Sequence, residues 1–369
     1  MPLLPLVPVL AQFLVLSDGR SMSTVKKIFN GEPFKKTLAC EFQIEAPRLG
    51  FSLMHWSGFN VTIPAKQFPS DGQTVRFGVA IEIKRKDGDP VYLTERFEFS
   101  KAPEGKTYPK GSALGYTGGY YVGPGEYHVS AFVADDKNNE CGKEWNIKVN
   151  SGKIPPRMEP NQISAVGDER WRGFAKDVPP NRLTIILEAA PLLPRRNMVR
   201  LSSYDRSVLL TSLTTLLDST KSTAASVIAV DPRNRKIIYS TDNFTPRELG
   251  RLARAIAGIN LGVVSLETLK GPNPTAFMET VLTAAQDPAS KSEAVVFLGP
   301  VWGWHGKVTP KIRELAQSLP RPHYLGLTRI AGLPDNLTAQ VVKAANGSVK
   351  QLLSPNDFAK ALEKVAAAK

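Results

Sequence analysis

The chain has 369 residues and a hydrophobic fraction of 42%, which is ordinary for a globular protein and excludes wholesale disorder. Its length favours two domains. The formal net charge of +13 is uneven, because residues 1–179 hold 23 Lys and Arg against 20 Asp and Glu, while residues 180–369 hold 24 against 14. The basic second half could attract acidic proteins, anionic glycans, membrane surfaces or nucleic acid, and charge alone does not choose among them.

Residues 1–20, MPLLPLVPVLAQFLVLSDGR, begin with an uncharged apolar run that contains a small-residue cleavage pattern at Val9-Leu10-Ala11. We interpret this segment as a secretory signal, although no basic residue precedes the run and three prolines interrupt it. The run is too short and too rich in proline for a membrane span, and no later segment reaches the required length. We therefore expect a protein exported to the periplasm or the cell exterior, with no transmembrane span.

Residues 38–150 are predicted to form an all-β sandwich. In QTVRFGVAIEIKRK apolar residues alternate with polar ones, and VYLTERFEFS returns after the turn KDGDP, so residues 73–100 are predicted to form a β-hairpin. A further strand in GPGEYHVSAFVADD, a turn at residues 135–138 and a last strand in EWNIKV complete the pattern. The segment 123–135 resembles the Pro-Gly-x-Tyr-x-Val phrase of immunoglobulin-like domains.

The only two cysteines, Cys40 and Cys141, both fall in this predicted sandwich. In an exported protein they could form one disulfide, and two separate buried thiols are an equal alternative. There is no C-x-x-C pair and no Cys/His cluster, so a structural zinc site is not expected.

Residues 151–180 contain five prolines and scattered charges, which predicts a linker or an extended arm, with Trp171 docked against a folded surface. From residue 181 the hydrophobic period changes. Strands are predicted in LTIILEAA, ASVIAV, KIIYS, EAVVFLGP and HYLGLTRI, and helices in YDRSVLLTSLTTLLDST, TPRELGRLARAIAGIN, PTAFMETVLTAAQ and FAKALEKVAA. This alternation predicts an α/β doubly wound, mostly parallel sheet that is covered by helices on both faces.

Two of the helix starts have recognisable capping residues. Thr245, Pro246 and Glu248 predict an N-cap, a first helical position and a capping box. Ser354, with Pro355 and Asp357 after it, marks the start of the last helix in the same way.

The region 181–366 resembles the von Willebrand factor A-type domain in the pattern and order of its elements. It has an opening strand and helix, a β-hairpin in ASVIAVDPRNRKIIYS and a Thr-Ala pair at the start of a middle helix. The closing phrase VVKAANGSVKQLLSPNDFAKALEKV matches the family's usual helix, turn, strand and helix. The resemblance covers about half of the chain and implies a ligand-binding edge beyond the carboxyl ends of the strands.

The family's metal motif is Asp-x-Ser-x-Ser after the first strand, with a Thr and a second Asp from two other loops. Carried over residue by residue, Glu188 falls at the first Asp, Ala190 and Leu192 at the serines, Thr275 at the Thr and Gly299 at the second Asp. Two of these five positions keep an oxygen, and a hard cation needs an oxygen cage. We therefore expect a degenerate site that binds no metal.

Two loops at the same edge offer candidate ligand-binding residues. Arg195 and Arg196 follow Pro194, and they either form a solvated basic turn or recognise an acidic partner through their guanidinium groups. In GPVWGWHGK, Trp302 is equally suited to contact a partner or to pack beneath the sheet edge, whereas Trp304 is expected to contact a partner or to be partly exposed. His305 is expected to lie on the surface.

Enzyme motifs are missing, since there is no Gly-x-Ser-x-Gly elbow and no Gly-rich loop ending in Gly-Lys-Ser or Gly-Lys-Thr. We expect a non-catalytic, exported, bacterial protein that needs no cofactor and binds an unidentified protein or surface ligand. If Arg195 and Arg196 recognise the partner, that partner is expected to be acidic. One alternative is a structural module of a larger assembly. Another alternative is a binder of anionic glycan or nucleic acid, of which nucleic acid is disfavoured for an exported protein. The affinity of such a binder should fall steeply as the salt concentration rises. The sequence does not indicate the oligomeric state.

Overall fold

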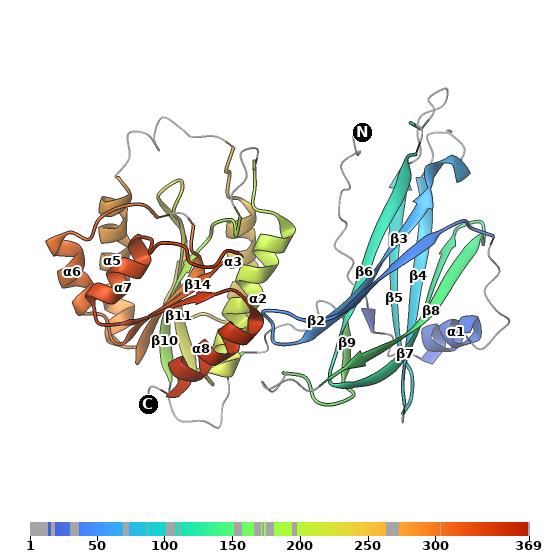
Figure 1. Cartoon of the computed structure of the whole chain (residues 1–369), viewed down its shortest axis with the longest axis horizontal. Coiled ribbons are helices and arrows are strands. Elements are labelled where there is room, and N and C mark those ends of the chain that lie inside the picture. Colours follow the sequence, from blue (N-terminus) through green and yellow to red (C-terminus); the bar gives the residue numbers. More distant parts are fainter. Residues whose placement is uncertain are drawn as a thin grey trace. The chain divides into compact units, whose positions relative to one another are not determined.

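The computed structural model describes residues 14–15, 19–29, 37–68, 74–86, 88–100, 108–109, 111–150, 157–165, 171, 173–174, 181–193, 198–262, 273–302 and 304–367. The chain divides into two compact units (Figure 1). Unit 1 comprises Met1–Gly50 and Met54–Arg170, and unit 2 comprises Phe51–Leu53 and Trp171–Lys369. Within the described ranges, no helix has the length and apolar character that crossing a bilayer requires.

Unit 1 contains two antiparallel sheets, as the all-β prediction requires. The five-stranded sheet has the order β1 (Leu14–Val15), β5 (Val91–Ser100), β4 (Thr74–Arg85), β7 (Gly125–Asp135) and β8 (Glu140–Val149). The four-stranded sheet has the order β2 (Glu41–Leu49), β3 (His55–Pro64), β6 (Ala113–Val122) and β9 (Ile163–Ala165). A helix, α1 (Gly19–Phe29), and a short 3-10 turn, η1 (Ala65–Gln67), accompany the sheets.

The alternating pattern of the sequence places every second side chain of the main strands in the core of unit 1. The predicted hairpin is confirmed, because β4 and β5 pair in antiparallel register from Thr74↔Ser100 to Ile83↔Val91. In β7 the alternate side chains from Tyr127 to Val133 are all buried. The Tyr127 hydroxyl donates a hydrogen bond to the Gly123 carbonyl at 2.8 Å, which holds the turn before β7 against the strand.

A helix, a short strand and a disulfide of unit 1 were predicted differently or left open by the sequence. Helix α1 begins within the predicted signal segment, while residues 1–13 lie outside the described residues. Strand β9 lies within the predicted linker and pairs with β6, and a strand of three residues is too short to show a period. The sulfur atoms of Cys40 and Cys141 are joined in a disulfide, so the structure shows the first of the two alternatives.

Unit 2 is built on one six-stranded sheet. Its order is β12 (Lys236–Thr241), β11 (Ala224–Asp231), β10 (Arg182–Glu188), β13 (Ala294–Pro300), β14 (Pro322–Leu327) and β15 (Ser348–Leu352). Only β12 runs antiparallel, as the second arm of a hairpin with β11, and the other neighbours are parallel. This is the mostly parallel α/β sheet that the sequence predicts.

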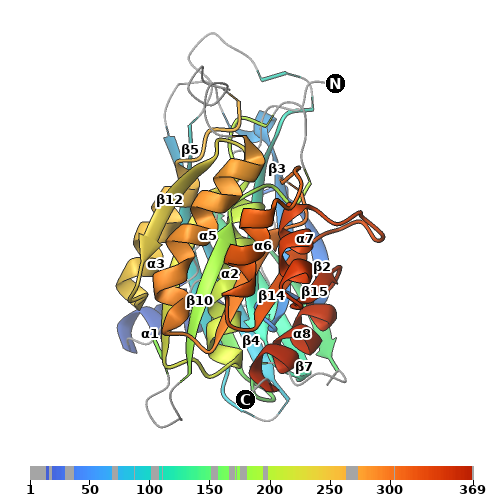
Figure 2. The same ribbon diagram turned by 90° about the vertical axis from the view of Figure 1, so that its left-hand side faces the viewer.

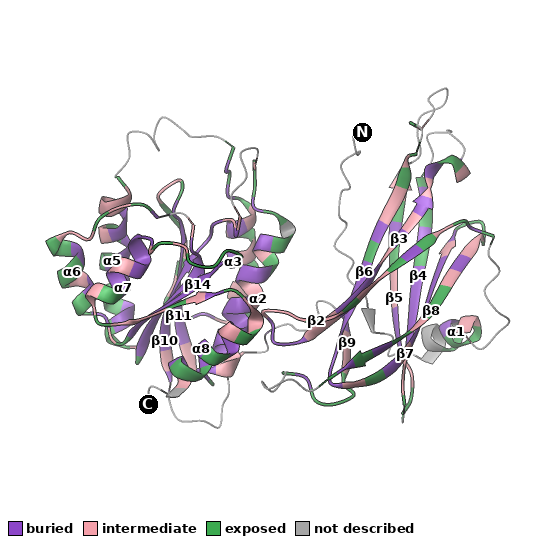
Figure 3. Ribbon diagram, viewed as in Figure 1, coloured by how far each residue is buried: buried purple, intermediate pink, exposed green. Residues whose placement is uncertain are grey.

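Helices cover both faces of this sheet (Figures 1 and 2). One layer holds α5 (Pro274–Ser290), α6 (Pro310–Gln317) and α7 (Leu337–Ala344), and the other holds α2 (Ser203–Ser219), α3 (Pro246–Ala257) and α8 (Pro355–Ala367). The central strands are buried throughout, as the purple ribbon in Figure 3 shows, because both of their faces carry apolar side chains. Trp171 is buried and stacks on Phe244 with 5.4 Å between ring centroids, so the predicted docking of this residue is confirmed.

The predicted capping box at Thr245 is wrong. Thr245 is the N-cap of α3 but makes no side-chain capping bond. Glu248 is occupied elsewhere, because its carboxylate accepts hydrogen bonds from the Tyr239 hydroxyl at 2.6 Å and from Arg251 at 2.8 Å. The start of the last helix is as predicted, since Ser354 and Asp357 bond reciprocally through side chain and backbone.

Candidate functional site

The carboxyl ends of β10, β13 and β14 meet at one edge of the sheet, which is where parallel α/β sheets bind their ligands. Glu188 is the last residue of β10 and is buried. Its Oε1 atom accepts a hydrogen bond from the Thr338 hydroxyl in the first turn of α7, whereas Oε2 has no partner among the described residues. Thr338 therefore satisfies one of the two oxygens of this buried carboxyl.

Burial controls the charge of Glu188. Desolvation raises the pKa of its carboxyl to about 8, and the hydrogen bond from Thr338 opposes this rise without cancelling it. At neutral pH the group is thus mostly protonated. A neutral carboxylic acid is a poor ligand for a hard cation, because such sites depend on anionic oxygens.

The other positions of the degenerate motif supply no cage around Glu188. Ala190 and Leu192 are buried and carry no side-chain oxygen. Thr275 is engaged in another contact, since its hydroxyl accepts from the Lys307 amide at 3.4 Å. Across the described part of the chain, no group of three or more His, Cys, Asp and Glu side chains is arranged to hold a metal ion.

Gly299 closes the same space from the neighbouring strand. A Cβ atom at this position would lie 2.5 Å from the Cβ of Glu188 and 2.6 Å from its carbonyl oxygen. Both are atoms at or next to the backbone of β10, so they cannot move aside as the tip of a flexible side chain can. An aspartate at position 299 would therefore require the two strands to separate.

We expect Gly299→Ala to lower the free energy of unfolding of unit 2 by about 1–3 kcal/mol, which is the usual effect of overpacking a well-filled core. The matched control is Gly250→Ala inside α3, where an added Cβ meets nothing within 4 Å. The control should be neutral or more stable by up to about 1 kcal/mol, because alanine favours helix more than glycine does. Urea denaturation of both variants checks this, and equal midpoints would contradict the close approach of the strands.

The loop after β13 differs from what the sequence suggested. We expected Trp304 to be partly exposed, but it is 1% exposed and stacks on Phe277 of α5 with 5.4 Å between ring centroids. Its carbonyl also accepts from the Leu337 amide, so the loop is packed under α5 and α7. Trp302 is half-buried and its Nε1 has no hydrogen-bond partner among the described residues, while His305 is exposed as expected.

A pocket of about 390 Å³ opens beside the degenerate position Leu192, and we call it the edge pocket. It is lined by Leu192, Leu193, Met198, Arg200, Ser202, Tyr204, Asp205 and Arg329. These residues come from the chain between β10 and α2, from the start of α2 and from the loop after β14. The predicted candidates Arg195 and Arg196 lie outside the described residues.

Sequence reasoning missed Arg200, Tyr204, Arg329 and Thr338. A signal for Arg329 was present, because it follows the buried strand HYLGL, whose carboxyl end must lie at the same edge as that of β10. No such signal marked Tyr204. The guanidinium of Arg329 lies 4.6 Å from the centre of the Tyr204 ring. The two residues are far apart in sequence, so no local pattern links them.

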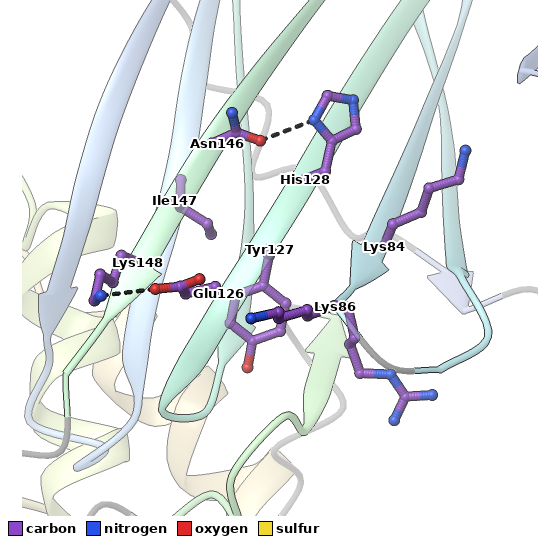
Figure 4. A pocket seen from close by; sticks show the side chains of 9 residues that line it. Lys84, Lys86, Glu126, Tyr127, His128, Asn146, Ile147 and Lys148 are labelled. Atoms are coloured by element: carbon purple, nitrogen blue, oxygen red, sulfur yellow. Dashed lines mark hydrogen bonds and ion pairs between the residues drawn. The ribbon is translucent and has the colours of Figure 1, made fainter.

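Unit 1 has a second pocket, of about 420 Å³, which we call the sandwich pocket (Figure 4). It is lined by Lys84, Arg85, Lys86, Glu126, Tyr127, His128, Asn146, Ile147 and Lys148. Much of its positive charge is already used: Lys148 pairs with Glu126 at 2.6 Å, Lys84 pairs with Glu82 at 2.9 Å, and Arg85 donates to the Asp89 carbonyl at 3.2 Å. This compensation makes the sandwich pocket a weaker candidate for anion binding than its composition suggests.

Comparison with known proteins gives neighbours in structure only. No family model and no curated protein matches the chain. A von Willebrand factor type A protein from Catenulispora acidiphila aligns at 13% identity over 67% of this chain and 46% of that chain, with a TM-score of 0.32. The conserved hypothetical protein BatB from Bacteroides thetaiotaomicron aligns at 13% identity over 51% of this chain and 99% of that chain, with a TM-score of 0.30.

A superoxide reductase (neelaredoxin) from Archaeoglobus fulgidus aligns at 12% identity over 31% of this chain and 93% of that chain, with a TM-score of 0.22. At these TM-scores none of the neighbours carries an argument about function.

Proposed function

We propose that unit 2 is a von Willebrand A-like domain whose metal position is closed, and that unit 1 is an immunoglobulin-like sandwich. The first assignment is supported by the sheet order β12-β11-β10-β13-β14-β15, with its single antiparallel strand at the hairpin edge. The second is supported by the bond from Tyr127 to Gly123, because a tyrosine that ties the start of a strand to the backbone a few residues upstream is typical of such sandwiches.

We further propose that the protein is a non-catalytic binding protein that recognises another protein at the carboxyl edge of the unit 2 sheet, without a metal. The observation that carries this proposal is the contrast between two adjacent places. Around Glu188 the edge is filled by Thr338 and Gly299, whereas the edge pocket next to it is open and carries both apolar and basic side chains. Concave sites of this mixed character are suited to hold a partner's side chains.

Export is part of the same proposal. The disulfide between Cys40 and Cys141 supports it, since disulfides persist in oxidising compartments such as the periplasm and the cell exterior. The bacterial source and the cleavage of the N-terminal segment are likewise proposed.

Site-specific photo-crosslinking in cells of the native organism tests the binding proposal. A benzophenone amino acid at Ile330, which is exposed and follows Arg329 at the edge pocket, is expected to capture one protein partner. The capture should be equal in Mg²⁺ and in excess EDTA and should persist in high salt, because neither a metal nor charge alone holds the partner. The matched control is the same amino acid at Gln317, an exposed residue that ends α6 and precedes β14, and it should capture nothing.

Each of the other possible results would favour a different function. Capture that needs Mg²⁺ would contradict the closed metal site, and capture of nucleic acid or glycan that disappears in salt would favour the polyanion binder. Equal capture from Ile330 and Gln317 would favour a structural module enclosed by a larger assembly.

A further inference from the structure

We propose that the edge pocket takes a carboxylate together with a neighbouring apolar side chain from an extended acidic segment of the partner protein. This inference rests on the proposed function and names the chemistry of what the site binds. It depends on residues that no metal-site pattern would single out, namely Arg200, Arg329 and Tyr204.

Neither arginine of the edge pocket is paired with a carboxylate of the described residues. Asp205, the acidic side chain among the described lining residues, is buried and accepts from the Leu192 amide at 3.1 Å, the Ser202 amide at 3.3 Å and the Ser202 hydroxyl at 2.6 Å. Asp205 therefore caps α2 with one carboxylate oxygen and holds the chain at Leu192 with the other. Arg200 and Arg329 are exposed, and neither forms an ion pair or a side-chain hydrogen bond with another described residue.

Both arginines are carried on anchored backbone. Arg200 forms an isolated bridge with Asn260, and the adjacent Val199 carbonyl accepts from the Leu261 amide at 2.7 Å. The loop that carries Arg329 is fixed by Thr328, whose hydroxyl bonds to both backbone groups of Ile330 at 3.1 Å. Because the backbone is held, binding an anion would require the two side chains to become ordered but not the segments that carry them.

The ring of Tyr204 orients the guanidinium of Arg329. It lies under the guanidinium of Arg329, with 4.6 Å from the Cζ atom to the ring centre. A guanidinium that lies over a ring keeps its N–H groups free to bind a planar, bidentate acceptor. A carboxylate has this shape, and its bonds to arginine are among the stronger hydrogen bonds in proteins.

Apolar side chains also line the edge pocket, and exposed hydrophobic residues lie next to it in sequence, which favours a peptide over a polyanion. Leu192, Leu193 and Met198 line the pocket. Val199, Tyr204 and Ile330, at 59%, 49% and 44% exposure, are three of the five large hydrophobic residues exposed in the described part of the chain. An apolar side chain next to the carboxylate can bury against this surface, whereas the anionic groups of a polyanion cannot.

A selection from a random seven-residue peptide library on the full chain tests this inference. The enriched peptides are expected to carry Asp or Glu beside a large apolar residue. For a synthetic peptide of the enriched sequence, calorimetry should show about a tenfold or greater loss of affinity with Arg200→Ala/Arg329→Ala, in line with the removal of charge-assisted hydrogen bonds. Arg329→Lys should lose affinity as well, because lysine keeps the charge and lacks the planar fork.

The matched control is Arg247→Ala/Arg254→Ala, which removes two exposed arginines of α3 that do not line the pocket. This control should leave the affinity unchanged. Changing the acid of the peptide to its amide should weaken wild-type binding as much as the double variant does, and should have no further effect on that variant.

Enrichment of peptides without an acid, or equal losses in the double variant and the control, would overturn the inference. So would a selection that enriches no sequence. The proposed function has a separate readout, because metal-independent crosslinking from Ile330 that persists in the Arg200→Ala/Arg329→Ala background would support partner binding at this edge while rejecting the carboxylate chemistry.

Discussion

Replacing both Cys40 and Cys141 by alanine is expected to lower the free energy of unfolding of unit 1 by about 2–5 kcal/mol, the usual cost of removing a native disulfide. The two cysteines are 101 residues apart in sequence, so the bond restricts the unfolded chain over most of the sandwich. In the chain-entropy view, closing a loop of about 100 residues is worth about 4.7 kcal/mol at 25 °C. Cys141 is also buried in the core between the sheets, so the loss includes packing.

Urea unfolding followed by hydrogen exchange and mass spectrometry measures this effect separately for the two units. Peptides from β7 and β8 report on unit 1, and peptides from β13 and β14 serve as an internal control, because the chain has only two cysteines and both lie in unit 1. Reducing the wild-type protein with dithiothreitol should reproduce the loss. Indistinguishable unfolding of oxidised and reduced protein would contradict the prediction.

The order of elements could be predicted because it depends on patterns that are local in sequence. Alternation identifies β4 and β5, and the change of period near residue 181 separates the β-rich part from the α/β part. Elements that depend on distant contacts escaped prediction. The capping box at Thr245 is absent because Tyr239, on a neighbouring strand, takes the Glu248 carboxylate.

The site was predicted less well, for a physical reason. That Leu192 and Gly299 bring no side-chain oxygen to this edge can be read from residue type alone. The burial of Trp304 depends on Phe277 lying above it, and the edge pocket depends on Arg329 reaching the ring of Tyr204 from another loop. Such pairings are set by the packing of the sheet and its helices, and no local pattern encodes them.

The stability of unit 2 is expected to fall as the pH rises from about 4.5 to about 8, the range in which the unfolded chain has lost the Glu188 proton and the folded protein still holds it. Burial raises the pKa of this carboxyl from 4.5 to about 8 in the folded protein. The folded state therefore binds the proton more tightly than the unfolded chain, so its contribution is complete below the unfolded pKa and is lost as the pH approaches the folded pKa. Each tenfold difference in proton affinity between the two states corresponds to about 1.4 kcal/mol, which gives an effect on the order of 3–5 kcal/mol for a fully buried group.

The substitution Glu188→Gln isolates this effect, because glutamine imitates the protonated acid and does not titrate. Urea unfolding at about pH 5 and about pH 9 should show that wild type and variant differ little at the lower pH, and that the variant is more stable at the higher pH by several kcal/mol, the size that the raised pKa implies. Other titrating groups cancel in the difference between the two proteins. Parallel pH profiles would show that Glu188 is not buried as a neutral acid.

Thr338→Val supplies the opposite perturbation at the same site. The Thr338 hydroxyl donates to Glu188 and holds its pKa lower than burial alone would. Without that donor the charged form loses its one hydrogen bond, so the decline of stability should extend to higher pH than in wild type. A cation at this edge would reverse these signs, because it would favour the ionised carboxylate. Stability that rises with pH, and more steeply when Mg²⁺ is added, would therefore refute both the neutral acid and the closed metal site.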